Sequence, residues 1–241
     1  MTTTPDVKVI TVQQKSPLLG RNVVHDPRSR AFPLLLSSPV DKSTWKNKVI
    51  RVYDPTPNPN QEIGCCTGVA KCIQLNSAGN RVSKRFLTFR VGSRVLNMSD
   101  AVKLYSRATE IDPYDGTYPP TDTGSSSLAS CKSAQDFGIA GAYNWIFGGA
   151  DEVVQNIMQG RTISVGTWWY EGMFNKDSKG RIRPTGEKVG GHQWAVRGYD
   201  VDRDWVMGRC WWGDFRDFWI ARTDLQSLLL DDGDAHFQKS I

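Results

Sequence analysis

The chain has 241 residues and a mass of 27.0 kDa, which is enough to bury a core without disulfide or metal support. Its 30 basic and 25 acidic residues are interspersed and form no nucleic-acid reading motif, so we expect a solvated surface and no nucleic-acid partner. No apolar run approaches the roughly 20 residues of a membrane span, and the N-terminus lacks the pattern of a signal peptide.

The first part of the chain is expected to hold little regular structure. Residues 1 to about 44 contain several turn formers and are predicted to form an extended arm over the body of the protein. The next element is a helix that begins at the second of two adjacent cysteines, Cys65 and Cys66. Gly64 allows a sharp turn before it, and the following segment has residues that can pack a helix, "CTGVAKCIQL".

Three further helices are predicted before residue 161. The segment "NMSDAVKLYSRATEID" has apolar residues at helical spacing, and Ser99 is placed to cap it. After a loop rich in Gly, Pro and Ser, a short helix is expected in "SSLASCKSAQDFG". Another is expected in "GADEVVQNIMQG", where Gly160 closes the helix.

The rest of the chain has the composition of a sheet. Short aromatic and β-branched segments separated by Gly and Asp turns predict strands of a mixed or antiparallel sheet: "TISVGTWWYEGMF", "GGHQWAVRGYDV", "DWVMGRCWWG" and "FRDFWIA". Helices followed by strands indicate an α+β fold with two lobes, and a cleft between lobes is the natural place for a site. We predict one domain over 45–241, with a helical lobe at about 60–160 and a sheet lobe at about 161–241.

The adjacent cysteines allow three interpretations: a metal site, a disulfide, or one reactive thiol with a neighbour. The five cysteines lack the paired spacing of a structural zinc site, so we predict neither a metal nor another cofactor. Adjacent cysteines bridge to each other only with severe strain, which argues against a Cys65–Cys66 disulfide.

A reactive thiol is the interpretation with a mechanism. A sulfur at a helix N-terminus faces unpaired backbone N–H groups, so we expect Cys66 to have a depressed pKa and unusual reactivity. A histidine would complete the activation. His25 and His236 are expected to be ordinary surface or capping residues. His192 follows two glycines that allow close backbone approach, at the start of a strand, although an ordinary core histidine is the alternative there.

Taken in order, several segments resemble papain-like cysteine peptidases, in particular the compact versions of actinobacteria and their phages. They cover nearly the whole chain: "HDPRSRAFP", "GCCTGVA", "YPPTDTGSSS", "WWYEGMF", "PTGEKVGGHQWAVRGYD" and "WWGDFRDFWI". The resemblance implies a papain-like two-lobe fold, with the cysteine on the helical lobe and the histidine on an antiparallel sheet lobe. Alignment on G-x-C-T-G-x-A makes Cys66 the nucleophile and Cys65 its neighbour, with His192 as the partner base.

Two positions depart from the family pattern. The oxyanion-hole glutamine is expected six residues before the nucleophile, where this chain has Asn60, and Gln61 is one place away; either amide could serve. The asparagine that orients the histidine aligns with Cys210, whose sulfur is a weak hydrogen-bond partner. The third catalytic member is therefore missing or supplied from elsewhere.

The resemblance implies a phage-encoded cysteine endopeptidase that acts on a peptide or protein substrate in the host cytoplasm or the virion. Phage virion or tail proteins are the further partners that this setting implies. The competing hypothesis is an eroded papain-like fold that serves as a structural or tail-associated virion component. Reactivity of Cys66 toward thiol probes discriminates between the two.

Overall fold

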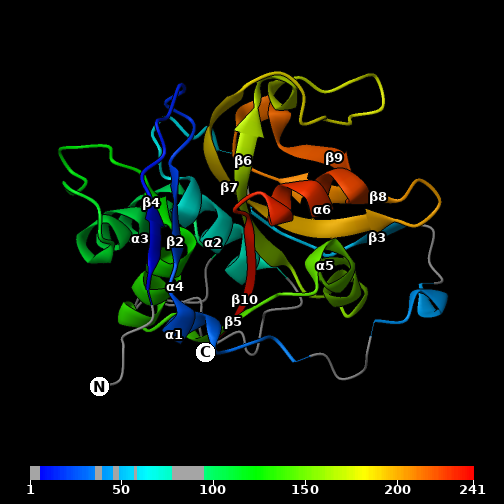
Figure 1. Cartoon of the computed structure of the whole chain (residues 1–241), viewed down its shortest axis with the longest axis horizontal. Helices are drawn as coiled ribbons and strands as arrows, with labels where there is room; N and C mark the ends of the chain where they lie inside the picture. The colour runs from blue at the N-terminus through cyan, green and yellow to red at the C-terminus, as the bar shows by residue number, and fades with distance from the viewer. Residues whose placement is uncertain (1–5, 36–39, 46–48, 57–58, 78–94) are drawn as a thin grey trace.

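The computed structural model describes residues 6–35, 40–45, 49–56, 59–77 and 95–241. Helices α2 (Cys66–Asn76), α3 (Met98–Ile111) and α4 (Ser127–Asp136) gather on one side of the molecule, and an antiparallel sheet with two further helices forms the other side (Figure 1). This is the α+β arrangement of two lobes that the order of helices and strands predicts. No helix in the described ranges is long and apolar enough to cross a membrane.

The helix that begins at the adjacent cysteines is confirmed. Helix α2 (Cys66–Asn76) starts at the second cysteine, and all of its residues are buried. Helix α3 (Met98–Ile111) is capped by Asn97, whose side chain accepts from the backbone of Ser99, so the prediction of Ser99 as the cap is wrong. Asn97 prevails because Asp100 three residues later completes a capping box with it.

The remaining helices are α1 (Pro27–Arg30), α4 (Ser127–Asp136), α5 (Gly149–Met158) and α6 (Arg222–Leu230), with short 3-10 turns η1 (Lys42–Thr44), η3 (Glu171–Phe174) and η4 (Gly213–Phe215). Of these helices, α4 and α5 lie close to where the sequence places them, whereas α1 and α6 fall in segments for which no helix is predicted. Gly160 has φ of +78°, which favours glycine and fits its predicted role just after α5.

Seven strands form the main sheet, with hydrogen-bonded order β5-β10-β6-β7-β8-β9 and β3 paired to β7. All of these pairings are antiparallel. The strands are β3 (Val49–Arg51), β5 (Ala140–Trp145), β6 (Ile163–Tyr170), β7 (Lys188–Asp200), β8 (Trp205–Arg209), β9 (Asp217–Ala221) and β10 (Asp234–Ser240).

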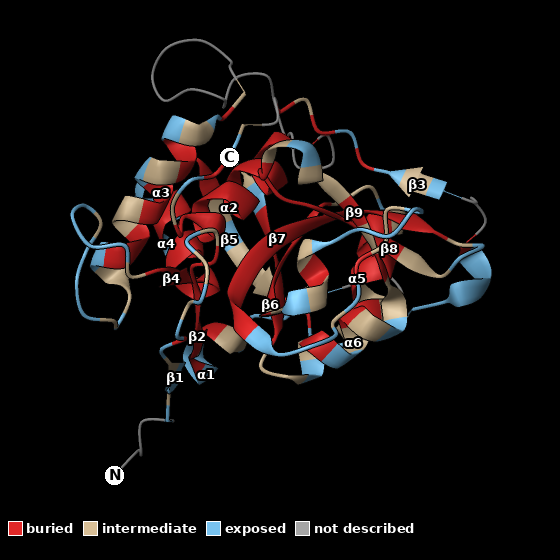
Figure 2. Ribbon diagram, turned by 90° about the horizontal axis from the view of Figure 1, so that it is seen from above, coloured by how far each residue is buried: buried red, intermediate tan, exposed pale blue. Residues whose placement is uncertain are grey.

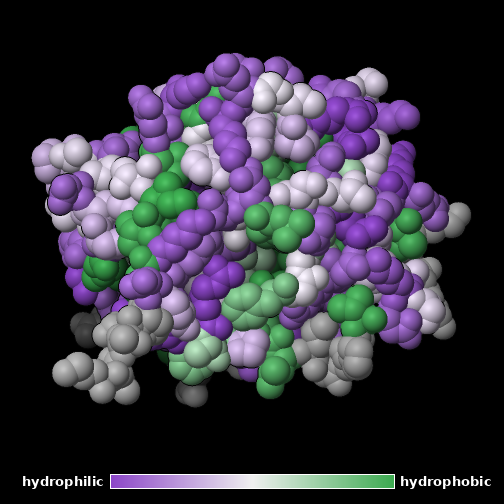
Figure 3. Space-filling view, viewed as in Figure 1, coloured by the Kyte–Doolittle hydropathy of each residue, from purple (hydrophilic) through white to green (hydrophobic). Residues whose placement is uncertain are grey.

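Strand β7 is buried on both faces (Figure 2). Its Trp194 and Val196 pack in a core cluster with α5 and α6, whereas Ala195 packs in a second cluster with α2 and α3. Full burial of one large side chain such as Trp194 contributes roughly 3 kcal/mol. The face seen in Figure 3 is mostly polar, with hydrophobic residues in separate patches.

The predicted end of the arm near residue 44 and the predicted border between the lobes near residue 160 stay predictions. Helix α5 packs in the cluster of the sheet, and β5 forms an edge of that sheet, so residues before 161 contribute to it. The predicted arm contains β1 (Lys8–Ile10) and β2 (Arg21–His25), which form a small sheet with β4 (Ser125–Ser126). The arm is thereby attached to the helical side.

Candidate active site

The first turn of α2 lies against β7 beside the predicted histidine. Cys66 is completely buried, and its Sγ accepts the backbone N–H of Gln193 at 3.4 Å. Gln193 follows His192 in β7, so the fold brings the predicted nucleophile and the predicted base onto facing elements. Gly20 lies near enough that its backbone N–H lowers the pKa of Cys66.

His192 is surrounded by aromatic rings. Its ring centroid lies 4.4 Å from that of Trp212 and 4.8 Å from that of Trp169. Neither of its ring nitrogens has a hydrogen-bond partner among the described residues. Burial lowers the pKa of His192 to about 3, so the imidazole is neutral near pH 7.

The thiol of Cys66 is also neutral. Burial raises its pKa to about 12, against the opposing effects of the Gln193 and Gly20 N–H groups and the nearby charge of Arg21. The expectation of a depressed pKa is therefore wrong for this closed arrangement, because loss of water outweighs the helix N-terminus. Burial raises the pKa of the neighbouring Cys65 as well, and the proximity of Cys66 and Asp122 adds to that shift.

A strap formed by residues 14–20 runs along β7 next to His192. The N–H of Lys15 donates to the Val189 carbonyl at 2.8 Å, and the N–H of Gly20 donates to the Gly191 carbonyl at 3.1 Å. Gly191 in turn donates its N–H to the side chain of Gln14 at 3.0 Å. The strap is thus hydrogen-bonded to the two residues on either side of Gly190.

The glycine pair before His192 predicts that a neighbouring backbone approaches β7 closely, and this is confirmed. A Cβ on Gly191 would lie 2.1 Å from the carbonyl oxygen of Arg21, which directly follows the strap. On the other side, a Cβ on Gly20 would lie 1.8 Å from the carbonyl oxygen of Gly64, in the turn before α2. Only glycine at these positions lets the strap pass between the turn before α2 and β7.

A buried ion pair fixes the end of the strap. The Arg21 guanidinium donates to the Asp234 carboxylate at 2.7 Å, and both side chains are almost completely buried. Asp234 also accepts the Ser127 hydroxyl at 2.6 Å. Removing one partner of such a pair leaves a buried charge and costs about 3–5 kcal/mol. The strap is therefore held between the start of β10 and the start of α4.

The two candidate oxyanion residues differ in position. Gln61 is completely buried, and its Nε2 donates to the carbonyls of Leu18 at 3.0 Å and Ile63 at 2.7 Å. Its Oε1 has no partner in the described part of the chain. Asn60 is exposed and forms a β-bridge with Trp212. Of the two amides, Gln61 is therefore the one that contacts the strap, and its donor group is occupied by the carbonyls of Leu18 and Ile63.

Cys210 follows β8 and is buried among the aromatic residues of the sheet side. Its backbone N–H donates to the Arg216 carbonyl at 3.0 Å, and burial raises the pKa of its thiol well above the ordinary value. With no hydrogen bond to the His192 ring among the described residues, orientation of that ring comes from the flanking Trp169 and Trp212.

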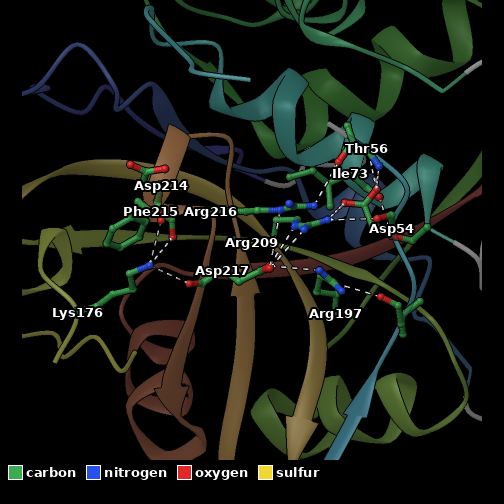
Figure 4. Close-up of polar contacts among 12 residues, drawn as sticks. Asp54, Thr56, Ile73, Lys176, Arg197, Arg209, Asp214, Phe215, Arg216 and Asp217 are labelled. Atoms are coloured by element: carbon green, nitrogen blue, oxygen red, sulfur yellow. Dashed lines mark hydrogen bonds and ion pairs between the residues drawn. The ribbon is translucent and has the colours of Figure 1, made fainter. Parts of the chain in front are cut away.

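The loop around Cys210 is fixed by a charged network that the sequence interpretation missed (Figure 4). Arg209 pairs with the buried Asp54 carboxylate and donates through Nε to Asp217 at 3.0 Å. Arg197 donates to the same Asp217 oxygen at 3.2 Å. The network joins β7, β8 and β9 to the segment before α2, and no local sequence pattern links these distant positions.

All five cysteines are buried thiols. Within the described ranges, no three His, Cys, Asp or Glu residues gather in a way that could hold a metal ion. The candidate groups are the Cys66 thiol, the neutral imidazole of His192 and the Gln61 amide, and groups of these kinds serve acyl-transfer chemistry.

The fold is that of papain-like cysteine proteases. The chain is similar to xylellain, a cysteine protease from Xylella fastidiosa, with a TM-score of 0.68 and 16% identity over 95% of this chain and 98% of that one. It is also similar to proCathepsin B S9 from Trypanosoma congolense, with a TM-score of 0.61 and 12% identity over 93% and 87% of the two chains. Digestive procathepsin L 3 of Tenebrio molitor larval midgut gives 0.52 and 12% over 88% and 76%. No protein-family model and no curated protein matches the sequence.

Proposed function

We propose that the chain is a cysteine endopeptidase in which Cys66 is the nucleophile, His192 the proton carrier and Gln61 the oxyanion donor. The observation that carries this proposal is the contact of the Cys66 sulfur with β7 at Gln193, next to His192, inside a papain-like fold. The proposed substrate is a peptide or protein. A phage origin and a setting in the host cytoplasm or virion belong to the proposal and rest on the sequence resemblance.

Peptide cleavage requires the ionised Cys66–His192 pair, whereas both groups are neutral in the closed arrangement. Once water reaches the site, the Cys66 proton can pass to His192, and the thiolate attacks the substrate carbonyl carbon. The oxyanion then takes the Nε2–H of Gln61 in place of the Leu18 carbonyl. The imidazolium returns its proton to the leaving amine, and water hydrolyses the resulting thioester.

The strap lies between the two elements that carry Cys66 and His192. Its Gly20 donates the backbone N–H to the Gly191 carbonyl in β7, and on its other side Gly20 leaves no room for a Cβ against the Gly64 carbonyl before α2. The strap must therefore move away before any substrate peptide can reach the sulfur.

A second candidate function is a structural or tail-associated virion component with an eroded site. It is favoured by one observation: Cys66 and His192 are both completely buried, and no hydrogen bond fixes the His192 ring among the described residues. In that case the neutral pair is a permanent part of the core.

The test is cleavage of a mixed peptide library, read by mass spectrometry, with the wild-type chain and a variant whose strap is displaced. We expect new peptide ends with the strap variant, none with the same variant carrying Cys66→Ala, and unchanged cleavage with the matched control Cys65→Ala. Cleavage that survives Cys66→Ala contradicts the assigned nucleophile. Absence of cleavage despite an alkylatable Cys66 supports the structural alternative.

A further inference from the structure

A second group of chemically reactive side chains lies inside the protein, away from the groups assigned to peptide cleavage. Its centre is Lys71 of α2, five positions after Cys66 and completely buried. The Lys71 Nζ lies 2.7 Å from Gln238 Oε1, 3.1 Å from His236 Nε2 and 3.4 Å from Cys131 Sγ. His236 was expected at the surface, but β10 inserts between β5 and β6 and buries it.

The surroundings of Lys71 favour the uncharged form of its amine. Its contacts are with two glutamine side chains, an imidazole and a thiol, and none of these is a carboxylate. Burial lowers the pKa of Lys71, while the Cys131 thiol has a pKa that burial raises and the nearby Lys71 lowers. A neutral amine has a free electron pair, so the pair combines a nucleophilic nitrogen with an oxidisable sulfur.

The two reacting atoms are held together by three elements. Lys71 belongs to α2 and Cys131 to α4, and Gln238 of β10 binds both. The Gln238 Oε1 accepts from Lys71 at 2.7 Å, and its Nε2 donates to the Cys131 carbonyl at 3.0 Å. Because a glutamine clamps both residues, the amine and the thiol meet in a fixed arrangement and not by chance encounter.

We propose that Lys71 and Cys131 form an oxidative modification site, at which a peroxide converts the amine and the thiol into a covalent nitrogen–sulfur cross-link. In the first step Lys71 takes the thiol proton, and the Cys131 thiolate attacks one peroxide oxygen. The O–O bond breaks, giving a sulfenic acid and, with the proton from Lys71, one water.

In the second step the neutral Lys71 nitrogen attacks the sulfenic sulfur. The S–O bond breaks, an S–N bond forms, and the hydroxyl leaves with an amine hydrogen as a second water. The sulfur is oxidised, the peroxide is reduced, and the protein loses two hydrogen atoms in total. The bond joins α2, which carries Cys66, to α4, and a thiol reductant reverses it.

The experiment treats the native full chain with hydrogen peroxide, then denatures and digests it for mass spectrometry. We expect a linked pair of peptides containing Lys71 and Cys131, about 2 Da lighter than their sum, that dithiothreitol separates. The linked pair should be absent in Lys71→Met, where dimedone should trap Cys131 as its sulfenic acid. It should persist in Lys132→Met, which removes the exposed amine next to Cys131 in the sequence.

A measurement on the wild-type chain keeps the test decisive if Lys71→Met does not fold. Peroxide treatment in guanidinium chloride should give no linked peptide, because the pair forms only in the folded chain. The proposal is overturned if native Cys131 remains a thiol, becomes a sulfinic acid or enters a disulfide while Lys71 is recovered unlinked. Linkage of equal yield in Lys71→Met, or in the unfolded chain, overturns it as well.

Discussion

Displacing the strap should convert Cys66 from an inert to a reactive thiol. The substitution is Gly20→Ala, which adds one methyl group where a Cβ would lie 1.8 Å from the Gly64 carbonyl oxygen. Both clashing groups are backbone, so a rotamer change cannot relieve the contact. The strap has to leave the turn before α2, and water then reaches the Cys66 sulfur.

The size of the expected change in alkylation rate follows from the pKa of Cys66. A value of about 12, against an ordinary 9.0, means that the thiolate fraction at pH 8 is about 10³-fold smaller than that of an exposed cysteine. Since only the thiolate reacts with iodoacetamide, wild-type Cys66 should alkylate about 10³-fold more slowly than an exposed thiol. Gly20→Ala should recover most of that factor, and pairing with His192 would raise it further.

The assay is alkylation at pH 8 followed by peptide mapping, which separates Cys66 from Cys65. Gly141→Ala is the matched control, because its methyl lies 3.1 Å from Cγ2 of the terminal Ile241 and 3.9 Å from the nearest backbone contact, the carbonyl oxygen of Lys239. Rapid alkylation of Cys66 in the wild-type chain would refute the reasoning, because the closed strap could not then be protecting it. A folded Gly20→Ala chain with unchanged Cys66 reactivity would refute it equally.

Three further outcomes are expected. The pKa of His192 is about 3 in the folded chain and 6.5 when unfolded, so stability is lost as the pH falls below 6.5. His192→Gln should therefore reduce the change in urea-unfolding free energy between pH 6 and pH 5 by about 1.2 kcal/mol, and parallel slopes would contradict the burial effect. With the strap displaced, Gln61→Ala should lower kcat by roughly 10²–10³ and Asn60→Ala should not, and the reverse ranking in steady-state kinetics would move the oxyanion site to Asn60. Asp54→Asn should cost about 3–5 kcal/mol in urea unfolding because it leaves Arg209 with one carboxylate partner fewer, and a loss below 1 kcal/mol would show that Asp217 alone suffices.

Local features made the nucleophile helix and the histidine strand predictable. Gly64 precedes a run of residues that pack at helical spacing, and the structure begins α2 at Cys66 as expected. The β-branched and aromatic composition around His192 predicts the strand β7. The glycine pair before His192 predicts the close approach of a neighbouring backbone. Each of these inferences depends on residues adjacent in the sequence.

The burial of Cys66 and the direction of its pKa shift depend on residues distant in the sequence, so local patterns do not predict them. The sign of the Cys66 pKa shift is set by burial under a strap more than 40 positions earlier, whose contacts are mostly backbone atoms and leave no side-chain pattern. His236 was misjudged for a related reason. Its nearness to the chain end says nothing about β10, which enters the sheet between two strands formed much earlier.

Closure by the strap and ionisation of the pair oppose each other. Burying a thiolate and an imidazolium costs several kcal/mol per ion, whereas the neutral Cys66 and His192 found here can be buried without that cost. By linkage, any condition that favours the thiolate must favour the open strap to the same extent. A rise in pH toward 9 ionises Cys66 in the open form only, so it draws the chain toward the open state. A substrate that stabilises the ion pair would act in the same direction, which couples entry of a peptide to activation of the nucleophile.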